Sequence, residues 1–166
     1  MSNQAKRTGA RGDTIVEVLL SITIIGFVLG AAYLLTNRSL QAGIAAREHT
    51  EAVNYVQGQI ERLKSAKESS TVTDFNNTYH VTAAAGKYCL IIDASTKVVT
   101  KKLTTDIGKP CDVDSDHPDG GGRYHLSTIY TDSDPNAKTF KFSATWERVG
   151  TGTTESVDIY YRTVTQ

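Results

Sequence analysis

The chain has 166 residues, and its 18 Lys and Arg side chains balance 18 Asp and Glu side chains, so the formal net charge is zero. This balance excludes a strongly basic protein that binds nucleic acids through its overall charge. The length leaves room for one compact domain of about 100 residues beside one long helix.

Residues 1–12 form a short polar segment in which every charge is positive. Lys6, Arg7 and Arg11 lie in it without any acidic residue, so the chain beyond it keeps 15 of its 18 basic side chains and all 18 acidic ones. A basic segment ahead of an apolar run is typical of a cytoplasmic N-terminus followed by an exported chain. We therefore expect a leader at residues 1–12 and a mildly acidic remainder outside the cytoplasm.

An apolar run occupies residues 13–35. From Thr14 to Leu35 it contains no Lys, Arg, Pro or Asn, and a helix of about 22 residues covers roughly 33 Å, close to the hydrocarbon thickness of a membrane. Within that stretch Glu17 is the single charged residue. A carboxylate inside a membrane segment costs about 3 kcal/mol on insertion scales and usually serves a function.

The residues around Gly12 follow a specific order. Gly12, Asp13 and Thr14 precede two aliphatic residues, then come Glu17 and a further apolar stretch that contains Ile24-Ile25-Gly26. This order resembles the start of type IV pilins and of the pilin-like subunits of type II secretion and DNA-uptake systems. The resemblance implies cleavage after Gly12 by a prepilin peptidase, N-methylation of Asp13, and a role of Glu17 in filament assembly.

Two positions differ from the family's usual pattern. Asp13 stands where the family usually has Phe or Met, and Leu34 stands where many major pilins have a proline that kinks the helix. The resemblance covers roughly the first third of the chain, and beyond it only the architecture carries over.

Two other interpretations of the apolar run remain open. A secretory signal peptide would have an apolar region of about 7–15 residues before a small-residue cleavage site, for which Gly30-Ala31-Ala32 is a weak candidate. An ordinary single-pass anchor would place Glu17 near the lipid headgroups. The length of the run and the position of its acid favour cleavage before the run.

Residues 36–66 are predicted to continue the helix with one apolar face. The apolar positions recur every three or four residues, and no proline interrupts the chain before Pro110. This stripe consists of Ala42, Ala46, His49, Val53, Val56, Ile60 and Leu63. Glu48 and Glu51 are predicted to lie off it, and we interpret His49 as a partly buried, hydrogen-bonded imidazole.

Residues 67–166 are predicted to form a globular β-rich head. Segments rich in branched and aromatic residues alternate with turn-like sequences, and the last two form the clearest hairpin, around Gly150-Thr151-Gly152. The expected strands are Tyr79–Ala83, Tyr88–Asp93, Lys97–Leu103, Arg123–Thr131, Phe140–Trp146 and Val157–Tyr161. Lys109–Gly122 is predicted to contain no regular element. The fold class is α+β, a long N-terminal helix packed on a C-terminal antiparallel sheet.

The two cysteines, Cys89 and Cys111, both lie in the part predicted to be exported. In an oxidising compartment a disulfide between them would close a loop of about 22 residues and stabilise the fold by roughly 3 kcal/mol. Two free thiols are the alternative. No spacing of Cys and His supplies the four ligands of a structural zinc site.

An acidic loop follows the second cysteine, with carboxylates at alternate positions ahead of glycines, an arrangement that suits calcium. Its carboxylates belong to Asp112, Asp114, Asp116 and Asp119. His117 and Arg123 occupy the positions that Gly and Glu hold in an EF-hand, so the match is incomplete. A solvated acidic loop without any cofactor is the alternative.

The sequence predicts a structural subunit rather than an enzyme, because its four histidines are scattered and no nucleophile motif or phosphate loop occurs. The resemblance implies a minor pilin of a type IV pilus-like filament, with other pilin subunits, the prepilin peptidase and the assembly platform as partners. Such a subunit is held in the inner membrane and becomes extracellular on assembly. A secretion or DNA-uptake pseudopilin and a membrane-anchored binding protein with a β ectodomain remain alternatives, and a ligand-binding surface on the head stays open.

Overall fold

The structure, a computed structural model, describes residues 13–80, 86–93, 95–106, 109–117, 121–131 and 137–164. The chain divides into two units, Met1–Gly43 and Ile44–Gln166. The leader with Gly12, the acidic residue Asp119 and most of the strand predicted at 79–83 lie outside the described residues.

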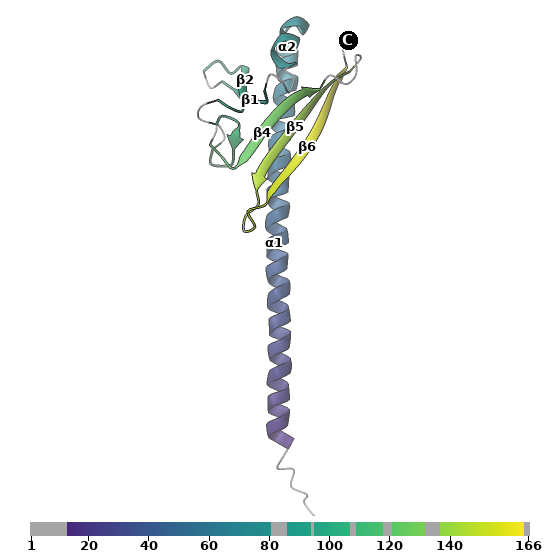
Figure 1. Ribbon diagram of the computed structural model, residues 1–166, viewed down its shortest axis with the longest axis vertical. Helices are drawn as coiled ribbons and strands as arrows, with labels where there is room; N and C mark the ends of the chain where they lie inside the picture. The colour runs from purple at the N-terminus through teal and green to yellow at the C-terminus, as the bar shows by residue number, and fades with distance from the viewer. Residues whose placement is uncertain are drawn as a thin grey trace, which may run out of the picture. The chain divides into compact units, whose positions relative to one another are not determined.

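Two helices precede the sheet (Figure 1). The first, α1, runs over Asp13–Ser69 and confirms the long helix expected from the sequence. The second, α2 (Val72–Tyr79), was not expected, and Tyr79 is therefore helical where a strand was predicted. The Thr71 hydroxyl accepts a hydrogen bond from the Asp74 backbone N–H at 3.2 Å, so this threonine caps a new helix three residues after the first one ends.

Six antiparallel strands form one sheet, in the order β2-β1-β4-β5-β6, with β3 paired to β4. The strands are β1 (Tyr88–Ile92), β2 (Val99–Leu103), β3 (Asp112–Val113), β4 (Tyr124–Thr131), β5 (Ala137–Glu147) and β6 (Thr154–Val164). The α+β prediction is thus confirmed, as are the five strands that fall on β1, β2, β4, β5 and β6. The prediction that Lys109–Gly122 contains no regular element is wrong, because β3 lies within it.

Gly122 explains how a strand fits into so irregular a segment. A side chain there is excluded, because a Cβ atom at Gly122 would lie 2.1 Å from the Val113 carbonyl carbon. The Gly122 N–H donates to the Asp112 carbonyl oxygen at 2.7 Å, so the loop folds back on β3 and presents it to β4. The glycine run therefore permits a close backbone approach rather than excluding regular structure.

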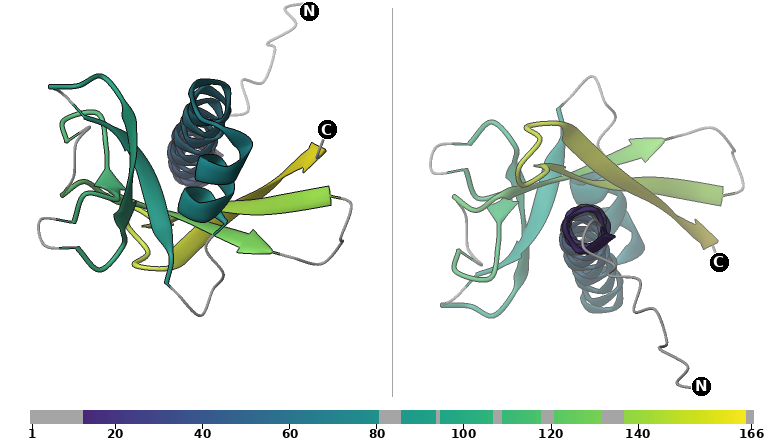
Figure 2. Two further views of the ribbon diagram at one scale, coloured as in Figure 1. Left: turned by 90° about the horizontal axis from the view of Figure 1, so that it is seen from above. Right: turned by 90° about the horizontal axis from the view of Figure 1, so that it is seen from below.

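The core of the second unit lies between one face of the sheet and the helical residues 52–66 and 72–79 (Figure 2). Along β5 the side chains alternate between buried and partly exposed, the pattern expected of a strand with one covered face. The buried ones are Phe140, Phe142, Ala144 and Trp146. Helix α1 contributes Ala52, Val56, Ile60, Leu63 and Ala66 to this core.

The predicted stripe on α1 is correct in part. Val56, Ile60 and Leu63 are buried as expected, whereas Ala46 and His49 are exposed, so the interpretation of His49 as partly buried is wrong. The covered face instead begins with Glu48, which is only 4% exposed although its charge placed it off the stripe. Its partners, described below, account for this difference.

A buried amide attaches β1 to α1. The register of β1 meets β4 at one pair, Tyr88↔Thr128, so the backbone of Leu90 has no strand beside it on that side. The Gln59 side chain takes the place of a strand: its Oε1 accepts from Leu90 N–H at 2.7 Å, and its Nε2 donates to Leu90 C=O at 3.0 Å. Gln59 is 3% exposed, and this pairing satisfies both halves of its amide.

Candidate functional site

The described part of the first unit is a helical segment whose apolar side chains are uncovered. Between Ile15 and Leu35 every large apolar side chain is 54–78% exposed, with Ile24 and Phe27 at the two limits. By length and composition the helix is apolar enough to cross a membrane, with a mean hydropathy of 2.4 in its most apolar window. This uncovered apolar segment, residues 15–35, is the candidate site of assembly or membrane insertion.

One hydroxyl group inside the uncovered apolar segment and one just after it are satisfied by the helix itself. Thr23 Oγ1 donates to Leu19 C=O at 2.7 Å, and just beyond the segment Thr36 Oγ1 donates to Ala32 C=O at 2.9 Å. These bonds lower the cost of placing a hydroxyl in an apolar medium. Glu17 differs, because it is exposed and has no hydrogen bond or ion pair with any residue that the structure describes.

The structure describes less of the two residues at the predicted cleavage point than of Glu17. Gly12 lies outside the described residues, and Asp13 is described only as the first residue of α1. The prediction of cleavage between them therefore remains a prediction.

The predicted disulfide is present. Cys89 in β1 and Cys111, next to β3, are joined with their Cα atoms 5.6 Å apart and are each 1% exposed. Because β1 and β4 share a single register pair, this bond adds to the hydrogen bonds, such as those of the Gln59 amide, that join the β1–β2 hairpin to the rest of the unit. We therefore interpret it as a structural disulfide.

Two carboxylates of the acidic loop, those of Asp112 and Asp114, bind protein groups. Asp112 Oδ1 contacts His125 Nδ1 at 2.5 Å. Asp114 accepts hydrogen bonds from the backbone N–H groups of Asp116, His117 and Arg123. Burial alone would raise the pKa of Asp114, but the hydrogen bonds from His117 and Asp116 outweigh it and leave the pKa below its usual value.

Among the described residues, no three His, Cys, Asp or Glu side chains gather closely enough to hold a metal ion. Asp119, the fourth carboxylate of the calcium prediction, lies outside those residues. The described part of the loop is organised by its own hydrogen bonds, and Asp114 is the centre of that organisation.

An ion pair whose carboxylate is buried links α1 to the residue that precedes β4 and to the β5–β6 turn. Arg123 Nη2 donates to Glu48 Oε1 at 2.6 Å and to Glu147 C=O at 2.7 Å, and the Val149 N–H donates to the same Glu48 oxygen at 3.2 Å. Burial alone would raise the pKa of Glu48, but the hydrogen bonds from Arg123 and Val149 dominate and lower it. Glu48 is therefore held as a carboxylate.

These contacts were missed from the sequence because Arg123 and Val149 lie 75 and 101 residues from Glu48 along the chain. No local pattern distinguishes Glu48 from the exposed acids of the same helix, such as Glu61, whose carboxylate pairs with Lys64. The only sequence signal is its position: Glu48 lies four residues before the buried Ala52, on the same helix face.

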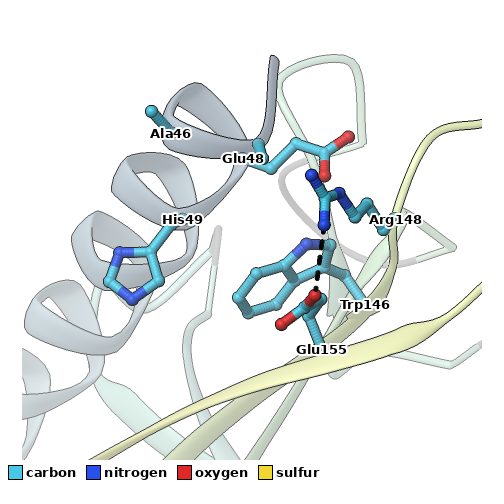
Figure 3. A pocket seen from close by; sticks show the side chains of 7 residues that line it. Ala46, Glu48, His49, Trp146, Arg148 and Glu155 are labelled. Atoms are coloured by element: carbon cyan, nitrogen blue, oxygen red, sulfur yellow. Dashed lines mark ion pairs between the residues drawn. The ribbon is translucent and has the colours of Figure 1, made fainter. Parts of the chain in front are cut away.

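A cavity of about 290 Å³ adjoins the ion pair, between α1 and the β5–β6 hairpin (Figure 3). His49 faces the edge of Trp146 across it, with ring centroids 6.4 Å apart. Arg148 and Glu155 form an ion pair at 3.8 Å on its hairpin side. The lining thus combines small and aromatic side chains with charges that compensate one another.

Comparisons with protein-family models, with curated proteins and with solved structures found no match to this chain.

Proposed function

We propose that the chain is a pilin-like filament subunit, a minor pilin of a type IV pilus-like filament. In this proposal a prepilin peptidase cleaves the precursor between Gly12 and Asp13, and the subunit waits in the membrane through residues 13–35. Assembly then packs the helices of many copies against one another, with the second unit, Ile44–Gln166, displayed on the filament.

The uncovered apolar segment carries the proposal. Covering a large apolar side chain is worth about 1.5–3 kcal/mol, so covering this segment gains on the order of 20 kcal/mol before the entropy of association is subtracted. Lipid supplies that cover in a membrane. When a subunit leaves the membrane, its apolar segment stays covered only if it packs against the same segment of other subunits.

Glu17 favours the filament over a plain anchor. An anchor gains nothing from a carboxylate near one end of its span, since the charge raises the cost of insertion. A filament gains a polar contact that fixes how neighbouring helices align. A pseudopilin of a secretion or DNA-uptake system would use the segment in the same way, and its filament would differ in length and location.

Processing tests the proposal directly. Mass spectrometry of the membrane-bound wild-type protein is expected to find a chain that begins at Asp13. The Gly12→Val variant is expected to keep its full leader, because a branched side chain at the scissile bond crowds the peptidase active site. Gly9→Val is the matched control, since it adds the same side chain to the leader away from the bond and should be cleaved normally.

Either of two results would contradict the filament proposal. An intact leader on the mature wild-type protein would favour a membrane-anchored binding protein. Normal cleavage of Gly12→Val would show that Gly12 is not the residue that the peptidase requires.

A further inference from the structure

After Asp13, the first residue of α1, two isolated charges of opposite sign mark the helix before residue 47. Between Glu17 and Arg47 the single charged residue is Arg38. Glu17 and Arg38 are both exposed, and neither has an ion pair or a hydrogen bond with any residue in the part of the chain that the structure describes. Both charges are therefore available to another molecule.

The helix brings these two charges to one side. They are 21 positions apart, which corresponds to about 32 Å along the axis and a rotation of only about 60° between them. Leu20, Ile24 and Leu35 lie on the same side between them. We name this set, Glu17, Leu20, Ile24, Ala31, Leu35 and Arg38, the end-charged stripe. All of its members are exposed.

The end-charged stripe discriminates between ways of pairing two helices. Parallel helices in register would place Glu17 beside Glu17 and Arg38 beside Arg38, which is repulsive at both ends. Antiparallel helices would satisfy both charges, but they would send the second units of the two chains in opposite directions, against the common orientation that the basic leader predicts. Parallel helices offset by about 32 Å place Glu17 of one copy beside Arg38 of the other.

We propose that Glu17 of one copy binds Arg38 of a second copy, in parallel helices offset by about 32 Å along their axis. This contact rests on the proposed filament function. A guanidinium binds a carboxylate through two parallel hydrogen bonds, and the apolar residues around the pair exclude water from it. Each interior copy uses both charges, one toward each neighbour, so the contact is head-to-tail and generates an open filament.

The rival partner for Glu17 is the α-amino group that cleavage creates on Asp13. Charge reversal separates the two partners, because only Arg38 can be exchanged with Glu17. Glu17→Arg and Arg38→Glu are each expected to lower the amount of protein in sheared filaments at least tenfold. The double variant, Glu17→Arg with Arg38→Glu, is expected to recover to within about threefold of wild type, because the pair is restored with its polarity reversed.

Cleavage of every variant is first checked by mass spectrometry, so that loss of processing is not mistaken for loss of assembly. A double variant no better than Glu17→Arg alone would overturn the Arg38 contact and favour the Asp13 amine. Incorporation of Arg38→Glu at the wild-type level would also overturn it, because Arg38 would then face solvent or lipid headgroups.

Cross-linking tests the offset without altering either charge. In the proposed register Ser21 of one copy lies beside Ala42 of the next, so Ser21→Cys with Ala42→Cys should give a ladder of oligomers on mild oxidation. The two natural cysteines do not compete, because they are bonded to each other. Ser21→Cys with Leu34→Cys is the matched control and should stay monomeric. Dimers formed by Ser21→Cys alone would show in-register packing and overturn the offset.

These outcomes are distinct from failure of the filament function itself. Absence of the wild-type protein from sheared filaments would remove the function. Wild-type protein in filaments, without rescue by the double variant and without a cross-linked ladder, would leave the function standing and remove only this contact.

Discussion

The Cys89→Ala/Cys111→Ala variant is expected to lose about 3 kcal/mol of the free energy of unfolding of the second unit. The bond spans 22 positions, and loss of that constraint widens the unfolded ensemble. For a unit of this size the midpoint of thermal unfolding should fall by roughly 10–15 °C. Circular dichroism of the full chain in detergent, followed through the signal of the sheet, measures the change.

Reduction provides the control for this variant. Wild-type protein in a strong reductant should unfold at nearly the same temperature as the variant, and the variant itself should not respond to the reductant. Equal midpoints for oxidised wild type and variant would mean that the non-covalent contacts of the β1–β2 hairpin, among them the Gln59 amide and the Tyr88↔Thr128 pair, suffice to hold it.

The Glu48→Ala variant is expected to lose about 3 kcal/mol of the same free energy. It removes the partner of Arg123 and leaves the Val149 N–H without its acceptor, and a broken buried pair costs more than an exposed one. Partial exposure of Arg123 keeps the loss at the low end of the range for buried pairs. Urea unfolding measures it. Glu61→Ala, which breaks the exposed pair with Lys64, is the matched control and should change stability by less than about 0.5 kcal/mol.

The contribution of Glu48 should depend on pH with a defined sign. Its pKa is lower in the folded state than its ordinary value of 4.5, so the folded state binds the proton less readily than the unfolded state. The stability gained is complete above pH 4.5 and is lost as the pH falls through the lowered pKa. The difference between wild type and Glu48→Gln should therefore shrink below pH 4.5, and a constant difference down to pH 2 would contradict this assignment.

Much of the fold follows from local patterns. The apolar run predicted the first part of α1, and alternation of apolar and polar residues predicted β5 and β6 around the turn at Gly150, whose φ of 85° suits a glycine. The cysteine pair was predicted from an exported context and is confirmed. The helix and the strands depend on residues that are close in sequence. The disulfide could be predicted because the chain has only two cysteines, so one pairing is possible within it.

What the sequence did not reveal depends on contacts between distant residues. Glu48 can be buried because Arg123 and Val149 donate hydrogen bonds to its carboxylate. Gln59 takes the place of a strand because β1 pairs with β4 at one register position only. Helix α2 is different: its capping residue, Thr71, is of a type that favours helix N-termini, and the prediction of a β-rich head from residue 67 gave it no such role. The candidate site could be located from the sequence, since the hydropathy of residues 15–35 already predicts a segment that a membrane or other helices must cover. Gly12 lies outside the described residues, so the cleavage point stays a prediction.

The disulfide also sets how far the second unit can stretch under load. The residues between Cys89 and Cys111, which include β2, form a closed covalent loop that tension applied at the chain ends does not reach. Each residue adds roughly 3.5 Å when extended, so the loop withholds about 75 Å of chain from a pulled molecule. In a single-molecule pulling experiment the oxidised protein should therefore lengthen by about 75 Å less than the reduced protein. In a subunit pulled from both ends, the residues between the two cysteines stay linked after the rest of the unit has unfolded.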